Sequence, residues 1–188
     1  MPPTNTPTAT ATATPSPTLT PTATPTETAV ERVVASQAGF SFLPAGDFVI
    51  DVQANQVGIV SEDDEILIFM ATNTTPTEES LQEILEGFIA NAGASMGEII
   101  PGEFSPLVVD GTEGLMADVT GEFLGEAMEG RVVVFAPRED LTFFAFGLAV
   151  NNRWPEEGLP AFEAIIGSVS FVLEEEATGA PNPEWDKF

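Results

Sequence analysis

The chain has 188 residues, of which 30 are Asp or Glu and five are Lys or Arg, so its formal net charge at neutral pH is −25. It contains no Cys, His or Tyr, which excludes disulfides, thiolate nucleophiles, imidazole bases and zinc sites built on Cys or His. The acidic charge would repel nucleic acid and anionic lipid, so we expect neither as a partner.

Threonine and proline dominate the N-terminal segment: residues 1–28 contain 12 Thr and seven Pro. Such a composition cannot bury a core, and its many prolines favour an extended, polyproline-like spacer. We predict that residues 1–38 form a disordered Thr/Pro-rich stalk or linker. Dense Thr beside Pro is also typical of O-glycosylated stalks, and the composition does not decide whether this one is glycosylated.

Stalks of this kind usually separate a folded domain from an export or anchoring signal. The sequence shows neither a signal peptide nor an apolar run long enough to span a membrane. We therefore expect that a signal was trimmed or lies upstream, with or without a lipid-modified Cys. The protein would then be extracytoplasmic, either secreted or tethered to the outer face of the membrane, with no insertion by this chain itself.

The composition changes after the stalk, and residues 39–173 read as a single α+β globular domain. This body carries 23 acidic residues and three Arg. Residues 174–188 form an acidic tail that begins with three consecutive Glu and contains Trp185 and Phe188. A frayed terminus explains the tail best.

Alternating apolar residues predict short strands in the first part of the body, at residues 40–42, 48–52, 56–60 and 65–71. Residues 61–64 join the last two as an acidic hairpin tip. The strand at 65–71 is apolar in both phases, which predicts that both of its faces are covered.

A capping-box pattern, Thr75-Pro76-Thr77-Glu78, predicts the start of a helix. Apolar residues then follow at helical spacing, and Gly93 is placed to end the helix. The residues of this apolar stripe are Leu81, Ile84, Leu85, Phe88, Ile89 and Ala92. Burial of the five large side chains contributes about 10 kcal/mol before opposing terms are counted, so core packing outweighs a membrane-surface role.

Further strands are predicted at residues 97–100, 107–110, 113–123, 130–136 and 141–150, with a helix between 155 and 166 and a closing strand at 168–173. The strand at 113–123 has a polar face and should lie near an edge or face water. The strand at 141–150 has bulky residues on one face and small ones on the other, which would let a helix approach closely. The small residues are Ala145, Gly147 and Ala149.

Three segments carry a resemblance to a known family: Gly39-Phe40-Ser41-Phe42-Leu43-Pro44, the turn Val109-Asp110-Gly111-Thr112-Glu113-Gly114, and the closing stretch from Phe162 to Phe171. The body resembles the PsbP-like superfamily, which includes the Ran-binding Mog proteins and many bacterial envelope lipoproteins. The resemblance implies an α/β/α sandwich with a largely antiparallel sheet, and non-catalytic, partner-facing roles in the cell envelope. It transfers no binding residue to this chain.

Two clusters invite a chemical interpretation. Glu62, Asp63, Asp64 and Glu65 could offer oxygen ligands to calcium, but they lack the EF-hand spacing, and a solvated hairpin tip also explains them. Arg131, Arg138 and Arg153 are the only cations of the body, and each could clamp an anion, although pairing with a neighbouring carboxylate is expected. Trp154, beside Arg153, is interpreted as a partly buried loop anchor.

We assign no catalytic, cofactor-binding or metal-ligating residue and expect no cofactor and no enzyme activity. The leading hypothesis is a non-catalytic extracytoplasmic binding or scaffold module that meets an unidentified protein or envelope partner, with a basic partner as one interpretation of the charge. The first alternative is a calcium-dependent adhesion or stabilising domain, with weak calcium binding. The second is a glycoside hydrolase that uses carboxylates alone, which needs two acids about 5 to 9.5 Å apart.

Overall fold

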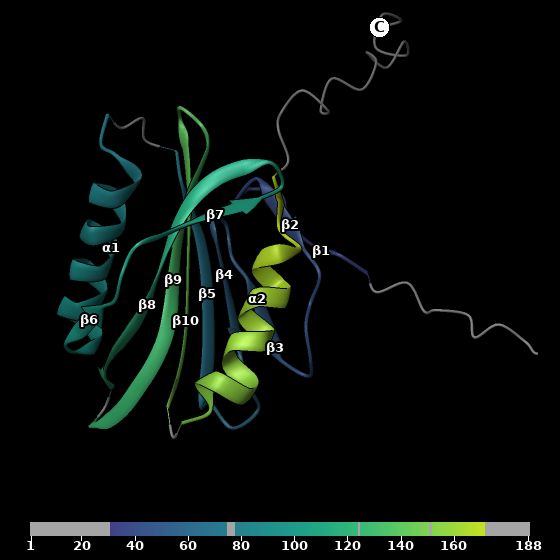
Figure 1. The fold of residues 1–188 in the computed structure, drawn as a ribbon. Coiled ribbons are helices and arrows are strands. Elements are labelled where there is room, and N and C mark those ends of the chain that lie inside the picture. Colours follow the sequence, from purple (N-terminus) through teal and green to yellow (C-terminus); the bar gives the residue numbers. More distant parts are fainter. Residues whose placement is uncertain (1–30, 75–77, 124, 151, 172–188) are drawn as a thin grey trace, which may run out of the picture.

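A computed structural model describes residues 31–74, 78–123, 125–150 and 152–171 (Figure 1). An eight-stranded sheet lies between two helices, one on each face, and a three-stranded sheet lies beside the second helix. This arrangement confirms the α+β fold and the predicted α/β/α layers. The Thr/Pro segment 1–30 and the acidic tail 174–188 lie outside the described residues, so the predictions made for them stay predictions.

The elements follow one another in chain order, and all strand pairs are antiparallel. They are β1 (Val33–Ala35), β2 (Phe40–Phe42), β3 (Val49–Val52), β4 (Gln56–Val60), β5 (Ile66–Asn73), α1 (Leu81–Met96), β6 (Ile99–Pro101), β7 (Ser105–Val109), β8 (Thr112–Phe123), β9 (Glu126–Arg138), β10 (Leu141–Val150), a π-helical turn η1 (Trp154–Gly158), α2 (Leu159–Gly167) and β11 (Ser170–Phe171).

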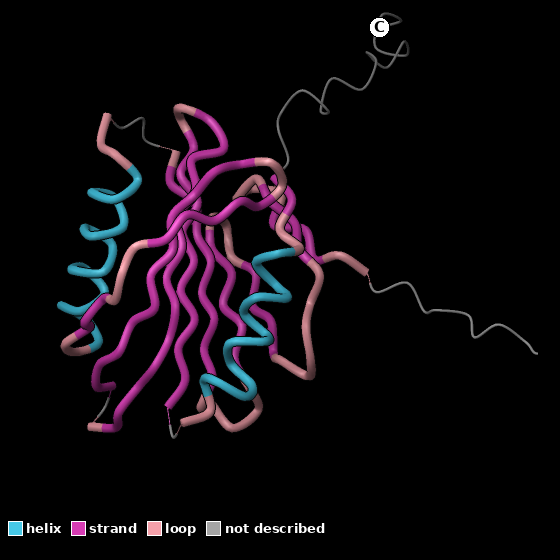
Figure 2. The backbone as a smooth tube through the Cα atoms, viewed as in Figure 1, coloured by secondary structure: helices cyan, strands magenta, loops and turns pink. Residues whose placement is uncertain are grey.

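The large sheet has the strand order β3-β4-β5-β10-β9-β8-β6, and β7 also pairs with β8. The predicted position of the strand at 113–123 near an edge is therefore confirmed. A two-residue turn joins β7 to β8, in which Asp110 has φ 50° and Gly111 has φ 74°. Both angles are positive, as a type I′ hairpin turn requires, and the Asp-Gly sequence favours it. Figure 2 shows the strands side by side, with the helices on opposite sides.

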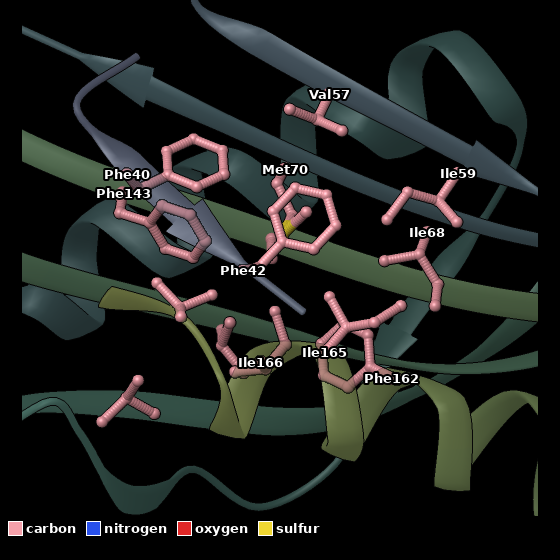
Figure 3. Packing of buried hydrophobic residues seen from close by; sticks show 14 of the residues in the cluster. Phe40, Phe42, Val57, Ile59, Ile68, Met70, Phe143, Phe162, Ile165 and Ile166 are labelled. Atoms are coloured by element: carbon pink, nitrogen blue, oxygen red, sulfur yellow. The ribbon is translucent and has the colours of Figure 1, made fainter. Parts of the chain in front are cut away.

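The main core lies between the large sheet, α2 and the small sheet (Figure 3). Phe40 and Phe42 of β2 are fully buried, as are Phe143 of β10 and Ile165 of α2. The ring centroids of Phe40 and Phe143 are 5.0 Å apart at an interplanar angle of 85°, the edge-to-face geometry that aromatic pairs prefer. Both sheets and α2 therefore share one hydrophobic core.

Small side chains on β10 let α2 approach the sheet, as the sequence predicts. A Cβ at Gly147 would lie 2.6 Å from Cδ2 of Phe162 and 2.9 Å from Cη2 of Trp154, too close for any side chain to be accommodated without movement. Ala145 and Ala149 on the same face are also buried. The second helix runs to Gly167, with Phe162, Ile165 and Ile166 buried as predicted.

The first helix begins later than its sequence pattern predicts. Residues 75–77 lie outside the described residues, but α1 starts at Leu81, and Ser80 is its N-cap. The Ser80 hydroxyl accepts from the backbone N–H of Glu83, while the Glu83 carboxylate accepts from the backbone N–H of Ser80, so Ser80 and Glu83 form the capping box of α1. The helix also passes Gly93 and ends at Met96, with Gly97 donating back to the Gly93 carbonyl.

Only one face of β5 is fully covered, which corrects the prediction that both would be. Ile66, Ile68 and Met70 are buried against the main core, whereas Leu67 and Phe69 on the other face are half-buried. The reason is that α1 packs chiefly against β6, β8 and β9, toward the other edge of the sheet (Figure 1).

Regular structure begins before Gly39, where the sequence analysis places the start of the folded body. β1 pairs with β2, and the Arg32 guanidinium donates to the hydroxyl and carbonyl oxygens of Ser41 at 3.2 and 3.0 Å and to the Ser168 carbonyl at 2.6 Å. These bonds attach the segment that follows the stalk to the small sheet. The closing strand predicted at 168–173 begins at Ser170, and β11 covers Ser170 and Phe171; residues 172 and 173 lie outside the described residues.

Candidate binding site

A cavity of about 800 Å³ opens between the loop before β3, the β4–β5 turn and the start of α2. We call it the Arg153 hollow. Its lining residues are Ala45, Gly46, Asp47, Phe48, Ser61, Glu62, Asp63, Ile66, Arg153, Glu157, Pro160 and Ala161. Segments that are distant in sequence thus meet at one end of the sheet.

The β4–β5 turn is held in shape by Ser61. Its hydroxyl donates to Oδ1 of Asp63 at 2.6 Å and accepts from the backbone N–H of Ile66 at 3.0 Å. The Asp64 N–H donates to the Ser61 carbonyl, and Asp64 has φ 61°, a left-handed conformation that Asp tolerates in turns. The predicted acidic hairpin tip is therefore confirmed, and its shape turns Asp63 toward Arg153.

Arg153 is positioned by its neighbour Trp154, which is only 5% exposed. The Trp154 ring lies 5.8 Å from the Phe162 ring, and a Cβ at Gly158 would lie 2.6 Å from Cε3 of Trp154. The π-helical turn can therefore close over the indole only because Gly158 has no side chain. Trp154 is the loop anchor that the sequence predicts, although it is more deeply buried than expected.

Three carboxylates hold the Arg153 guanidinium. Its Nη1 donates to Asp63 and, at 3.0 Å, to Glu65, while its Nε donates to Glu157 at 3.2 Å. These hydrogen bonds, that of Glu157 foremost, raise the pKa of Arg153 above its ordinary value. The bond from Arg153 lowers the pKa of Glu157, and the bonds from Ser61 and then Arg153 lower the pKa of Asp63. Arg153, Glu157 and Asp63 therefore stay charged at neutral pH.

The hollow combines an apolar floor with an acidic rim. Phe48, Ile66 and Ala161 supply buried or half-buried apolar lining together with the exposed Pro160, and the same lining has four exposed carboxylates and one guanidinium. Such a surface suits a cationic group on an apolar stem, since the stem can contact the floor while the charge meets the rim. Long basic side chains of a protein partner have this form.

The arrangement does not favour hydrolysis or calcium binding. The described carboxyl groups with a shifted pKa, Asp63, Glu83 and Glu157, are all shifted downward, whereas a glycosidase needs one acid with a raised pKa. Arg153 occupies two of the four carboxylates at the hairpin tip. Among the described residues, no group of three or more carboxylates is placed to hold a metal ion.

Arg131 and Arg138, the other two arginines of residues 39–173, pair with acids, as the sequence predicts. Arg131 binds Asp118 at 2.7 Å and Glu163 at 2.8 Å, which joins α2 to β8 and β9, and Arg138 binds Asp140 at 3.1 Å. The hydrogen bond to Asp118 is the main cause of the raised pKa of Arg131. These contacts explain both arginines without a ligand.

The sequence analysis identified the acidic hairpin tip and Arg153 separately, but it did not predict that they contact each other. Asp63 and Arg153 are 90 positions apart, and no local spacing pattern links them. Phe48 was interpreted only as a strand residue, because its place beside the cavity follows from the course of the loop before β3. An excess of acids around the few arginines was the one available signal.

Comparison with known proteins gives no relative by sequence, since no family model and no curated protein matches the chain. Solved structures do match. The cyanobacterial PsbP (CyanoP) of Synechocystis sp. PCC 6803 aligns with a TM-score of 0.59 at 14% identity, over 80% of this chain and 97% of CyanoP. This chain has the PsbP-like fold.

Two further solved structures align with the chain. The Ran-binding protein Mog1p of Saccharomyces cerevisiae aligns with a TM-score of 0.55 at 12% identity, over 76% of this chain and 95% of Mog1p. LpqN of Mycobacterium tuberculosis, described as involved in cell envelope biogenesis, aligns with a TM-score of 0.46 at 11% identity, over 70% of this chain and 89% of LpqN. Within the described segments of our chain, no helix has the length and apolar character to cross a membrane.

Proposed function

We propose that this PsbP-like chain is a non-catalytic binding module that holds a basic segment of a protein partner in the Arg153 hollow. The observation that carries the proposal is the composition of the hollow: an apolar lining with four carboxylates and a single guanidinium, which pairs with two of them, Asp63 and Glu157. A long basic side chain is the common protein group that satisfies both surfaces.

The fold supports a partner-binding role. Mog1p, which shares it, is a Ran-binding protein, so a body of this architecture can serve to bind another protein. The charge of the chain points to the kind of partner, because a net charge of −25 steers basic surfaces toward it and repels acidic ones.

We place the module outside the cytoplasm, with residues 1–30 acting as the spacer that separates it from a membrane. The Thr/Pro composition of that segment supports this placement. Fractionation of the native, full-length product tests it. Recovery in the envelope or the medium is expected, and recovery in the cytosol would contradict this part of the proposal.

A charge-matched pair of variants tests the binding site. The probe is an eight-residue arginine-containing peptide, and its counterpart with citrulline in place of arginine has the same shape without the charge. Glu62→Arg changes the rim of the Arg153 hollow, and Glu129→Arg makes the same change on β9; both glutamates are exposed. Titration calorimetry of the full chain measures the affinity of each variant for each peptide.

We expect the arginine peptide to bind the wild-type chain and the citrulline peptide to bind at least about tenfold more weakly. Glu62→Arg should reduce the affinity for the arginine peptide by about tenfold, and Glu129→Arg by no more than about threefold, because only the former removes a carboxylate that the bound segment would contact. Equal losses in the two variants would show that only net charge matters and would overturn the proposed site.

A further inference from the structure

One edge of the large sheet is open at β3. This strand is the last of the sheet on the side away from β8, and within the described segments no other strand pairs with its outer side (Figure 1). Val49 and Val52 of β3 are 63% and 44% exposed, so water reaches this edge. An unpaired strand edge presents backbone donors and acceptors with which another chain can pair.

The pairing register shows which backbone groups of β3 are available. The Gln53 N–H donates to the Gln56 carbonyl at 2.9 Å, at the end where β3 turns into β4. Hydrogen-bonded pairs recur at every second residue of an antiparallel ladder, so the backbone groups of Asp51 also face β4. The N–H and C=O groups of Ile50 and Val52 therefore point away from β4, toward the open edge.

The opposite edge of the large sheet is protected in a way that β3 is not. β6 contains Pro101 and β7 contains Pro106, and proline has no backbone N–H. The two-residue turn after β7 makes Val109 and Thr112 a hydrogen-bonded pair, so Pro106 and Val108 face away from β8. Proline on the outer side of an edge strand hinders pairing with another chain, and β3 contains none.

The open edge is continuous with the Arg153 hollow. Phe48 lines the hollow and immediately precedes β3, and both Phe48 and Ile50 pack against the main core. Alternate residues of a strand share a face, so Val52 lies on this face too. An added strand would place every second side chain on the same face, and the side chain opposite Phe48 would lie beside the hollow.

Asp51 determines which kind of strand can pair with β3. Its carboxylate accepts a hydrogen bond from the Gln53 side chain at 2.8 Å, and the residue is exposed. Two copies of the chain, paired antiparallel through Ile50 and Val52, would place their Asp51 side chains directly opposite each other. Like charges in that position destabilise a strand pair, whereas a basic residue opposite Asp51 stabilises it. The charge therefore favours a basic strand over a second copy of this acidic chain.

We propose that the basic segment of the protein partner binds as an additional antiparallel strand along the outer edge of β3. All strand pairs of the sheet are antiparallel, and the new strand would continue this pattern. It would exchange backbone hydrogen bonds with Ile50 and Val52, place one basic residue opposite Asp51, and present another to the Arg153 hollow from the position opposite Phe48. The inference rests on the proposed function and adds the conformation and register of the bound segment.

The register dictates the sequence of a probe peptide. In the end-capped peptide Ser-Val-Lys-Val-Val-Arg-Ser, the second, third and fourth residues would lie opposite Val52, Asp51 and Ile50, and the arginine opposite Phe48. N-methylation of the second and fourth residues removes the N–H groups that would donate to β3. N-methylation of the third and fifth residues removes as many N–H groups from the side that faces away. The two methylated peptides have the same side chains and the same charge, so they form a matched pair.

Titration calorimetry of the full-length chain with these peptides tests the strand pairing. The unmodified peptide should bind. Methylation of the second and fourth residues should weaken binding by at least about tenfold, and methylation of the third and fifth by less than about threefold, because only the first pattern removes hydrogen bonds to the sheet edge.

Two proline variants test the same edge from the side of the protein. Val52→Pro removes an N–H group that points to the open edge, and Val108→Pro makes the same change on β7, in the phase where Pro106 already stands. Val52→Pro should weaken peptide binding by about tenfold or more, and Val108→Pro by less than about threefold. Thermal unfolding shows whether each variant is folded. The methylated peptides need no change in the protein, so they test the inference even if Val52→Pro does not fold.

Hydrogen exchange locates the bound strand. In the free chain the amides of Ile50 and Val52 should exchange faster than the amide of Asp51, which is bonded to β4. The unmodified peptide should slow exchange at Ile50 and Val52, because their N–H groups would then be bonded to the added strand.

Several outcomes would overturn the inference. Equal effects of the two methylation patterns, or unchanged exchange at Ile50 and Val52 in the presence of peptide, would exclude strand addition. Slow exchange at Ile50 without peptide would name a different occupant: a second copy if sedimentation shows dimers, and a segment of the chain itself if it shows monomers.

Failure of this inference and failure of the proposed function give different results. Citrulline in place of the peptide's arginine separates them. If citrulline weakens binding but the two methylation patterns act equally, the Arg153 hollow holds a basic side chain without strand addition. If citrulline has no effect but methylation of the second and fourth residues still weakens binding, the peptide pairs with β3 and the proposed role of the hollow is wrong.

Discussion

Gly147→Ala should destabilise the protein although it adds a single methyl group. The added Cβ would lie 2.6 Å from Phe162 and 2.9 Å from Trp154, whereas carbon atoms pack favourably at about 3.5 to 4.0 Å. Either α2 moves away from β10 by about 1 Å, or the two rings leave their preferred rotamers. Overpacking of this kind costs about 1 to 3 kcal/mol, and replacing a strand glycine by alanine returns about 0.5 to 1 kcal/mol.

The expected net loss is therefore about 1 kcal/mol in the free energy of unfolding, within a range of about 0 to 2.5 kcal/mol, and a loss of about 1 kcal/mol lowers Tm by roughly 2 to 4 °C for a chain of this size. Urea unfolding followed by Trp154 fluorescence measures it, with Trp185→Phe as the common background because the chain has two Trp. Gly58→Ala on β4 is the matched control, since a Cβ there meets nothing within 4 Å, and it should be neutral or mildly stabilising. Equal stability of the Gly147 and Gly58 variants would refute the close approach of α2 to the sheet.

Three other perturbations follow from the same contacts. Phe162→Ala removes a side chain that is 1% exposed and should cost about 3 to 5 kcal/mol in urea unfolding; a cost below about 1 kcal/mol would mean that α2 is not part of the core. Ser80→Ala removes the N-cap hydroxyl of α1 and should cost about 1 kcal/mol, with faster hydrogen exchange in the first turn; unchanged exchange would contradict the capping box. Arg153 links stability to pH, because the pKa values of Asp63 and Glu157 lie below their ordinary values of 3.8 and 4.5. Below about pH 4.5 the unfolded chain therefore binds more protons than the folded chain, and the free energy of unfolding decreases as the pH is lowered. The wild type should be more stable than Arg153→Gln at pH 6, and this difference should shrink as the pH falls through the lowered pKa values; a difference that stays constant to pH 2.5 would contradict the ion pairs.

Periodicity predicted most of the strands because each face of a strand sees a uniform environment. The alternation of Phe144 and Phe146 with Ala145 and Gly147 was enough to predict which face a helix approaches closely, and the structure confirms it. The predicted start of α1 was wrong because two capping-box patterns lie five residues apart, at Thr75 and at Ser80. The sequence around Thr75 alone does not show that Ser80 caps the helix.

The coverage of β5 illustrates a different limit. Its apolar residues in both phases predicted two covered faces, but only one face is fully covered, because the position of α1 across the sheet depends on its packing against β8 and β9. The Arg153 hollow was missed for a similar reason, because Phe48, Asp63 and Arg153 come from three separate segments of the chain. Local patterns predict elements, while sites made of several elements require the fold.

The measurement that bears most directly on the binding role is NMR mapping of the full-length chain during titration with the arginine peptide, with the citrulline peptide as reference. The proposed site predicts that the largest shifts fall on residues around the Arg153 hollow, with Phe48, Ser61 and Ala161 among them. It also predicts that these shifts are absent with citrulline. Arginine-dependent shifts distributed evenly over the acidic surface, or centred away from the Arg153 hollow, would contradict the account.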